Sequence, residues 1–387
     1  MKLIEEQQRF TKIFNKPKPA DKRSTPLALA QEMVSKIPEE VIKNKNSKFL
    51  DPCAGTGTFL VALFDRLSEY HGAGHIMSNM LYGYDNTITS KTLLIKLGFK
   101  NIERVDFLNT ELDMKFDVII VNPPYQKSTG ASRGITIWPF FVERGFELLK
   151  DGGYLSMIHP NTWRHGKKTT ANVLELFTNN NIIHLQLGNV ATGKEIFGVT
   201  TSVDWYVIQK SPNQGSSHVV DTEGVSITLD LSGVKRLPDS HLDLVGTVID
   251  LEDLDTVDIL YNTKYHTQKE YVVSEKSEEY KYPLVYTLKQ GGPTFKWTND
   301  NTKAFFGVPK IVLASGLGYP VLDLEGKYGT CEFSYSIVDS PENLLTIYDK
   351  LMDPVVLNIL KDMGSGKGHN YLKQAVSLLK KDFWRYI

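Results

Sequence analysis

The first half of the chain alternates between short apolar runs and longer amphipathic stretches. The apolar runs predict seven strands, over residues 48–51, 80–85, 102–107, 117–121, 154–158, 182–187 and 202–209. The amphipathic stretches predict helices over residues 26–37, 58–70, 87–97, 137–149 and 168–180, the first with Thr25 as its N-cap. Apolar strands that alternate with helices are typical of a parallel sheet covered on both faces. The seventh strand is expected to be antiparallel, as a hairpin partner.

This alternation ends near residues 211–217, a Ser-, Pro- and Gly-rich stretch that predicts a linker. We therefore expect a first domain over residues 1–212, with a polar N-terminal arm over 1–24, and a second domain over 213–387. The second half has short, scattered strand signals and a helical pattern over 371–384. The predicted fold class is α/β, a Rossmann-like, seven-stranded and mostly parallel sheet followed by a mixed α+β domain.

Composition narrows the function classes. The 387 residues are 41% hydrophobic with a net charge of −1, so any surface for a polyanion must be a local cluster. Two cysteines, Cys53 and Cys331, are too few for a disulfide framework or a zinc site, and no metal is expected. The charged N-terminus lacks a signal peptide, and no apolar window would span a membrane. A cytoplasmic protein is the expectation.

The loop after the first strand reads Asp-Pro-Cys-Ala-Gly-Thr-Gly-Thr over residues 51–58. Gly55 and Gly57 allow a sharp turn and a close approach of the backbone to a ligand. The loop lacks the Lys-Ser/Thr pair of a phosphate-binding loop and the third glycine of the dinucleotide fingerprint, which argues against phosphate binding. A plain tight turn between strand and helix is the alternative.

Acidic residues follow three successive strands. Asp51 ends the first strand, Asp85 the second and Asp106, before Phe107, the third. Ligands of open α/β sheets bind at the carboxyl ends of the strands, where an acid can accept both hydroxyls of a ribose. Asp106 and Phe107 together suit an adenine, as acceptor for its amine and as packing surface. Any one of these acids alone would be read as a solvated loop residue.

The fourth strand ends in Asn122-Pro123-Pro124-Tyr125. Two consecutive prolines stop the strand because they lack the N–H that a ladder needs. The resulting stiff corner presents an amide, free carbonyls and an aromatic face, which together can hold a planar amino group. A Pro-rich turn without a ligand is the alternative reading.

In this order the motifs resemble the S-adenosylmethionine-dependent amino-methyltransferases of DNA, in the group with the cofactor region first, the catalytic tetrapeptide next and target recognition last. The resemblance covers about residues 20–210. It implies S-adenosylmethionine as cofactor, with Asn122, Pro123, Pro124 and Tyr125 as catalytic residues. It implies a cofactor site made of Thr25, Pro26, Asp51, Pro52, Ala54, Gly55, Gly57, Asp85, Asp106 and Phe107.

The substrate side is predicted from fewer residues. The resemblance implies that Phe197 packs on an extruded base. The alternative reading of Phe197 is a phenylalanine of the hydrophobic core. Arg164 and Lys167 lie in a basic cluster after the fifth strand and are predicted to contact DNA phosphates. A solvated helix start is the alternative for that cluster.

The predicted function is site-specific methylation of adenine N6 in double-stranded DNA, on a base flipped out of the duplex. The predicted host is a prokaryote or a virus, and a separate cognate restriction nuclease would be a partner. Cytosine N4, RNA adenine and protein glutamine remain alternative targets, although cytosine enzymes more often have Ser for Asn122. A catalytically silent recognition subunit is the non-enzymatic alternative.

Overall fold

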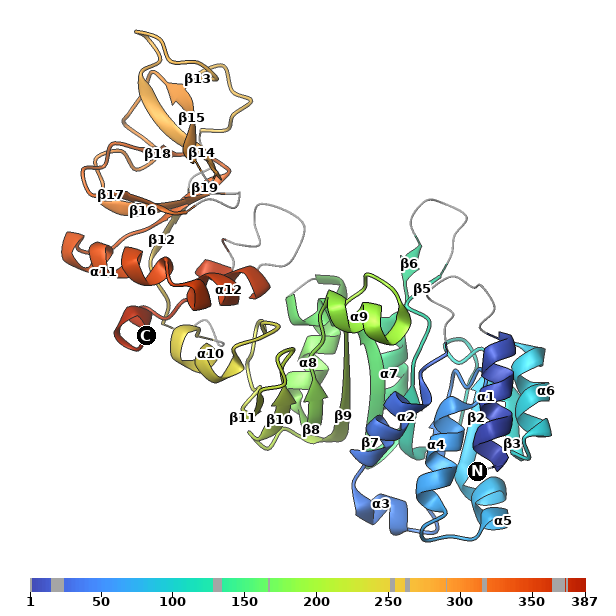
Figure 1. Ribbon diagram of the computed structural model, residues 1–387. Helices are drawn as coiled ribbons and strands as arrows, with labels where there is room; N and C mark the ends of the chain where they lie inside the picture. The colour runs from blue at the N-terminus through green and yellow to red at the C-terminus, as the bar shows by residue number, and fades with distance from the viewer. Residues whose placement is uncertain are drawn as a thin grey trace. The chain divides into compact units, whose positions relative to one another are not determined.

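The chain folds into two compact units, residues 1–233 and 234–387 (Figure 1). The computed structural model describes residues 2–14, 24–127, 134–165, 168–250, 255–261, 265–289, 291–314, 319–363, 373 and 375–387. The boundary lies about twenty residues beyond the predicted one at 212/213. Strands β10 (Ser217–Val220) and β11 (Ser226–Leu229) lie after the expected linker and extend the first unit's sheet.

The first unit contains a nine-stranded sheet in the order β11-β10-β8-β9-β7-β4-β1-β2-β3. The seven predicted strands are all present, as β1 (Phe49–Asp51), β2 (Leu81–Asp85), β3 (Asn101–Arg104), β4 (Phe116–Val121), β7 (Leu149–Pro160), β8 (Asn180–Gln186) and β9 (Val203–Pro212). Strand β9 is antiparallel to both neighbours, β7 and β8, as predicted. The predicted class, a mostly parallel α/β sheet, is confirmed.

Helices cover both faces of this sheet (Figure 1). The predicted helices are α2 (Leu27–Ser35), α4 (Thr58–Leu67), α6 (Ile88–Lys96), α7 (Trp138–Leu148) and α8 (Ala171–Asn179). Along β7, Ile158 belongs to the core beneath α2 and α4, whereas His159 stacks on Trp138 of α7. Because successive side chains of a strand point to opposite faces, α7 lies across the sheet from α2 and α4. Both faces are therefore buried, which explains the apolar strands.

Two helices of the first unit replace segments predicted without structure. Residues 2–14 of the predicted arm form α1 (Lys2–Phe14), which packs against α4, with Leu3 and Ile4 against the core. Helix α9 (Val190–Phe197) occupies a predicted loop, and Asn189 and Thr192 form its capping box. Shorter elements are α3 (Glu39–Lys43), α5 (Ala73–His75), the π turn η2 (Ile76–Met80), and the hairpin of β5 (Gln126–Lys127) and β6 (Ile135–Thr136).

The second unit is a mixed α+β domain, as predicted. One sheet has the order β12-β19-β16-β17, formed by Ile259–Tyr261, Ser334–Ile337, Lys310–Ala314 and Val321–Asp323. The other has the order β13-β15-β14-β18, formed by Val272–Val273, Gly292–Thr298, Tyr282–Lys289 and Gly329–Thr330. The helices are α10 (Leu242–Val248), α11 (Pro341–Leu351) and α12 (Pro354–Met363).

The predicted C-terminal helix over residues 371–384 is wrong for much of its described part. Leu379 pairs with Ile249 in an isolated bridge, and Phe383–Arg385 forms a 3-10 turn. Tertiary pairing therefore overrides the local helical pattern at this end of the chain.

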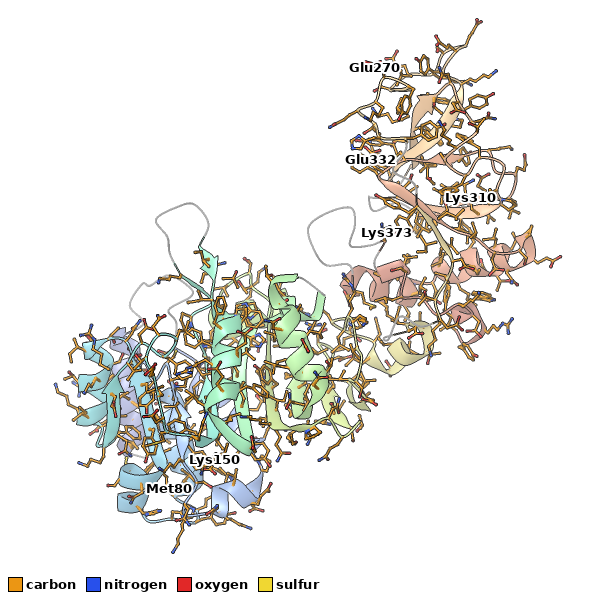
Figure 2. All side chains as sticks on the ribbon, turned by 180° about the vertical axis from the view of Figure 1, so that it is seen from behind. Met80, Lys150, Glu270, Lys310, Glu332 and Lys373 are labelled. Carbon is orange, nitrogen blue, oxygen red and sulfur yellow. The ribbon has the colours of Figure 1, made fainter. Side chains whose placement is uncertain are left out.

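The second unit contains a buried ion pair. Lys310, marked in Figure 2, donates to Asp323 over 2.9 Å, and both side chains are almost fully buried. Asp323 also accepts the backbone N–H groups of Lys327 and Tyr328, so it closes the loop after β17. Within the described ranges of both units, no helix has the length and apolarity needed to span a membrane.

Candidate functional site

The loop between β1 and α4 turns on Gly57, which has a φ of 83° and forms the N-cap of α4. The positive φ requires glycine, and a Cβ at this position would also displace the side chain of Leu94 on α6, whose Cδ2 would lie 2.5 Å from it. The N–H of Ala54 donates to the carbonyl of Tyr84 on β2 over 2.9 Å. The loop is thereby fixed against the neighbouring strand end.

Asp51 lies at the start of this loop and is 2% exposed. One carboxylate oxygen accepts the N–H of Cys53 over 3.0 Å. Burial raises the pKa of Asp51 to about 8, and the nearby Asp85 carboxylate adds to the shift. A buried acid of this kind suits a ligand that brings positive charge, because the charge would return the carboxyl to its ionised form.

Asp85 connects three of the predicted site segments. Its carboxylate accepts the N–H of Gly55 over 3.0 Å and the N–H of Thr87 over 2.8 Å. Its backbone carbonyl accepts the N–H of Val105, just before Asp106, over 2.9 Å. The ends of β1, β2 and β3 are thus joined at one edge of the sheet, as expected for parallel strands.

Asp106 and Phe107 face different surroundings. Asp106 is exposed, and its carboxylate accepts the side-chain amide of Asn109 over 2.9 Å. Phe107 is 3% exposed and stacks on Phe141 of α7, with ring centroids 5.7 Å apart. One face of the Phe107 ring is therefore covered by protein; contact of this residue with adenine stays a prediction.

Asn122 follows β4 and donates its side-chain amide to Thr25 Oγ1 over 3.1 Å. The helix after Thr25 was predicted to use this residue as its N-cap, but the N-cap is Pro26 and no side chain caps that end. The Thr25 hydroxyl is engaged by Asn122 instead. Because the nitrogen of the Asn122 amide is held, its oxygen is the end left to accept hydrogen bonds from a ligand.

Tyr125 ends the tetrapeptide with its ring packed against the first unit's core. Its hydroxyl is buried and has no hydrogen-bond partner among the described residues, and burial raises the pKa of this phenol. The Tyr125 carbonyl accepts the N–H of Ile137 over 3.1 Å, which fixes the backbone after the two prolines. Pro123 is buried, and Pro124 is half-buried.

Phe197 is the last residue of α9 and is 5% exposed. It belongs to the core cluster against which Tyr125 packs. The two aromatic residues are thus brought to the same core, but Phe197 lies inside it and has little open ring surface. Packing of Phe197 on a base remains a prediction that requires this side chain to move.

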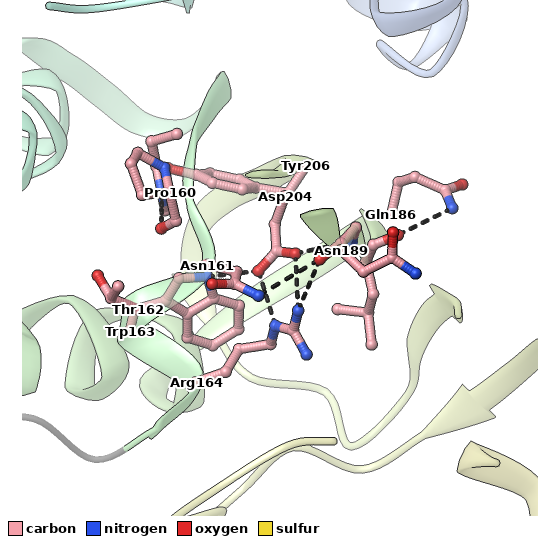
Figure 3. Close-up of polar contacts among 12 residues, drawn as sticks. Pro160, Asn161, Thr162, Trp163, Arg164, Gln186, Asn189, Asp204 and Tyr206 are labelled. Atoms are coloured by element: carbon pink, nitrogen blue, oxygen red, sulfur yellow. Dashed lines mark hydrogen bonds and ion pairs between the residues drawn. The ribbon is translucent and has the colours of Figure 1, made fainter. Parts of the chain in front are cut away.

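Arg164 is not a surface residue, so its prediction as a phosphate contact is wrong. Its side chain is fully buried and forms an ion pair with Asp204 of β9, at 2.8 Å from Nε (Figure 3). Asp204 also accepts the indole N–H of Trp163 and the N–H of Gly188. The guanidinium instead stabilises the turn Asn161–His165, and Lys167 lies outside the described residues.

The sequence patterns did not predict one set of contacts to the loop between β1 and α4. Gln7 of α1 is 1% exposed and donates to Thr58 Oγ1 over 2.9 Å. The spacing along the chain could have predicted that Gln7 is buried. Gln7 lies four positions after Leu3 and three after Ile4, so the three side chains share one face of the helix.

The sheet is of the open α/β type, and its polar residues gather at the carboxyl ends of β1, β2 and β4, where such sheets bind ligands. Residues 66–197, about a third of the chain, match the family described as Eco57I restriction-modification methylase, which agrees with the class of enzyme that the motifs predict. S-adenosylmethionine is the methyl donor of this class. The site residues fit it, because the donor is cationic and the buried Asp51 carboxyl forms no ion pair with any residue that the structure describes.

Similar proteins include the Type II methyltransferase M.VspI of Vibrio sp. (strain 343), 28% identical over 157 residues, 35% of either chain. The Type II restriction enzyme and methyltransferase RM.BcgI of Heyndrickxia coagulans is 26% identical over 179 residues, 41% of this chain and 28% of that protein. The matches thus span about a third of these relatives' length. A putative class I S-adenosylmethionine-dependent methyltransferase from Listeria monocytogenes superposes with a TM-score of 0.45 at 16% identity, covering 57% of this chain and 73% of that one.

Proposed function

We propose that this protein transfers a methyl group from S-adenosylmethionine to the exocyclic N6 of an adenine in double-stranded DNA. The observation that carries the proposal is the hydrogen bond from the Asn122 amide to Thr25. It leaves the Asn122 oxygen as an acceptor at the end of β4, next in the sheet to the strand that carries Asp51. An acceptor beside the cofactor edge suits an amino group as methyl acceptor.

The cofactor, when bound, supplies an electrophilic methyl group. Asp51 would pair with positive charge on the cofactor, and Asp85 would accept its ribose hydroxyls. The loop of Gly55 and Gly57 would contact its methionine part through the backbone. Asp85 is already oriented for this role by the N–H groups of Gly55 and Thr87.

Asn122 and Pro123 would act on the base. The Asn122 side-chain oxygen and the Pro123 carbonyl would accept the two N–H groups of adenine N6. These bonds direct the nitrogen lone pair toward the methyl group and stabilise the positive charge that forms on the nitrogen. A strong general base is not needed, and positioning for in-line transfer supplies much of the remaining rate.

An adenine inside a duplex is inaccessible, so it would be flipped out at a cost of a few kcal/mol. Tyr125 would stack on one face of the flipped base, with Phe197 on the other. The second unit, residues 234–387, would provide target recognition. We further propose action in the cytoplasm and a separate restriction nuclease that cuts the same unmethylated target.

The test is transfer of labelled methyl groups to plasmid DNA from a host without its own DNA methylation, followed by digestion to nucleosides. N6-methyladenine is the expected product. Asn122→Ala should reduce transfer by about 10²- to 10³-fold or more while cofactor binding persists. Asn172→Ala, an exposed asparagine on α8 that bonds Glu143, is the matched control and should retain activity.

Each alternative target has a distinct product. N4-methylcytosine in the digest would refute adenine as the target. Labelling of RNA or of protein glutamine, with duplex DNA unlabelled, would refute DNA as the substrate. Wild-type transfer by Asn122→Ala would refute the mechanism.

A further inference from the structure

Helix α1 brings one buried amide onto the cofactor loop. Gln7 donates through Nε2 to Thr58 Oγ1 over 2.9 Å and to Thr56 Oγ1 over 3.4 Å. The three side chains are 1%, 6% and 2% exposed, in the order Gln7, Thr58 and Thr56. Gln7 therefore spans both sides of Gly57, the residue on which the loop turns.

A second contact holds the same loop from the chain that leads into α2. The hydroxyl of Ser24 lies 3.3 Å from Thr56 Oγ1. Ser24 is next to Thr25, whose own hydroxyl holds Asn122. The loop hydroxyls are thus bound by two segments that precede β1 in the sequence.

We propose that Gln7 is a positioning residue for S-adenosylmethionine, which acts by holding the loop of residues 52–58 in its ligand-binding conformation. A loop with two glycines in seven residues has many alternative conformations when its side chains are unbound. Affinity falls in proportion to the fraction of molecules in which the loop is competent to bind. Bonds from α1 raise that fraction before the ligand arrives, which strengthens binding without contact to the ligand.

The chemistry of the contact favours this role over simple packing. An apolar residue would suffice to attach α1 to α4, and Leu3 and Ile4 already pack against the core. Burying an amide is unfavourable unless it is hydrogen-bonded, so a buried glutamine is retained only where its bonds are made. Here the side-chain nitrogen of Gln7 donates to two hydroxyls of the loop.

The test compares Gln7→Met with Gln8→Met. Methionine keeps the length of glutamine and removes the amide, and Gln8 is the exposed neighbour on the same helix. Equilibrium dialysis with S-adenosylmethionine, without DNA, should show about tenfold weaker binding for Gln7→Met and less than twofold change for Gln8→Met. Hydrogen exchange of the amides at residues 53–58 in the ligand-free protein should be faster in Gln7→Met only.

A role in stability alone has a different signature. It would lower the melting temperature of Gln7→Met while leaving the cofactor dissociation constant and the loop exchange unchanged, and that result would overturn the proposal. Should Gln7→Met fail to fold, Thr58→Val removes the same bond from the loop side and should weaken binding comparably. In the double variant the two effects should add only in part, because both variants remove the bond between Gln7 and Thr58; full additivity would also refute the proposal.

This inference rests on the cofactor and not on the adenine target. Dialysis measures cofactor binding directly. It therefore tests the role of Gln7 even if the methyl acceptor is a group other than adenine N6. A wild-type product other than N6-methyladenine would therefore refute the proposed function and leave the proposal for Gln7 standing.

Discussion

Asn122 and Thr25, 97 positions apart in the sequence, are joined by a hydrogen bond of 3.1 Å between the side-chain amide and the hydroxyl. The bond sets which end of the amide faces the ligand, because the nitrogen is bound and the oxygen is left to accept. Thr25 is 5% exposed, so water competes little for this contact. The orientation of the predicted catalytic amide thus depends on a residue at the start of α2.

Thr25→Val should lower kcat about three- to tenfold, because it removes the acceptor that orients Asn122. The dissociation constant for S-adenosylmethionine should change less than twofold. Steady-state rates and equilibrium dialysis separate the two quantities. Thr25→Ser keeps the hydroxyl and is the control. A weaker cofactor affinity with unchanged kcat would mean that Thr25 acts on the cofactor, as the family resemblance implied.

Tyr125→Phe should leave the free energy of unfolding unchanged or raise it by up to about 1 kcal/mol. The hydroxyl is buried without a partner among the described residues, so its removal relieves an unmet desolvation cost. The ring that would stack on the base is retained, and kcat should be preserved. Tyr125→Ala removes the ring and is the contrasting variant. Urea unfolding and transfer assays measure both effects; a large destabilisation by Tyr125→Phe would show that the hydroxyl is bound after all.

Arg164→Met should destabilise the first unit by about 3–5 kcal/mol, because it leaves the buried Asp204 carboxylate without its cation. Arg164→Met combined with Asp204→Asn should recover part of that loss, because the amide removes the buried charge and its oxygen can still accept a hydrogen bond from Trp163 or Gly188. Denaturant unfolding gives the free energies. The salt dependence of DNA binding should not change in the double variant, since neither residue reaches a phosphate. A reduced salt dependence would reinstate the phosphate contact predicted from the sequence.

The free energy of unfolding should fall as the pH drops from about 6.5 to 4. Burial lowers the pKa of His184 to about 4, and the charges of Lys36 and His218 add to the shift. The unfolded chain binds this proton near pH 6.5, so stability is fully present above that value and is lost below it. His184→Phe should remove about 2 kcal/mol of the difference between pH 8 and pH 5. An unchanged difference would refute the assignment.

The sequence predicted well, for a geometric reason, which residues meet at one edge of the sheet. Asp51, Asp85 and Asn122 were identified by their position after apolar strands, and the carboxyl ends of parallel strands must meet at one edge. The glycines at residues 55 and 57 followed from the same position between strand and helix. These are local signals, which a single chain segment carries by itself.

The sequence failed where a side chain's role depends on a distant partner. Arg164 has basic neighbours and looks like a surface residue, but its partner Asp204 lies 40 positions away on β9. Thr25 precedes Pro26 in the sequence pattern of an N-cap, yet its hydroxyl does not cap the helix and is instead bonded by Asn122. Gln7 shares a helical face with Leu3 and Ile4, but the hydroxyls that it bonds, on Thr56 and Thr58, lie 49 and 51 positions away. Such pairings have no signature in the segment that contains either member.

Strand β9 has a consequence for the order in which the first unit can be completed during synthesis. It lies between β7 and β8, both of which leave the ribosome earlier, and it carries Asp204 and Tyr206, the partners of Arg164 and His159. Until residues 203–212 have emerged, the position between β7 and β8 in the sheet is empty. The side chains of Arg164 and His159 then lack these partners. A nascent chain that stalls before this point therefore exposes the edges of β7 and β8 that β9 covers, and strand addition there by another polypeptide is a hazard until β9 inserts.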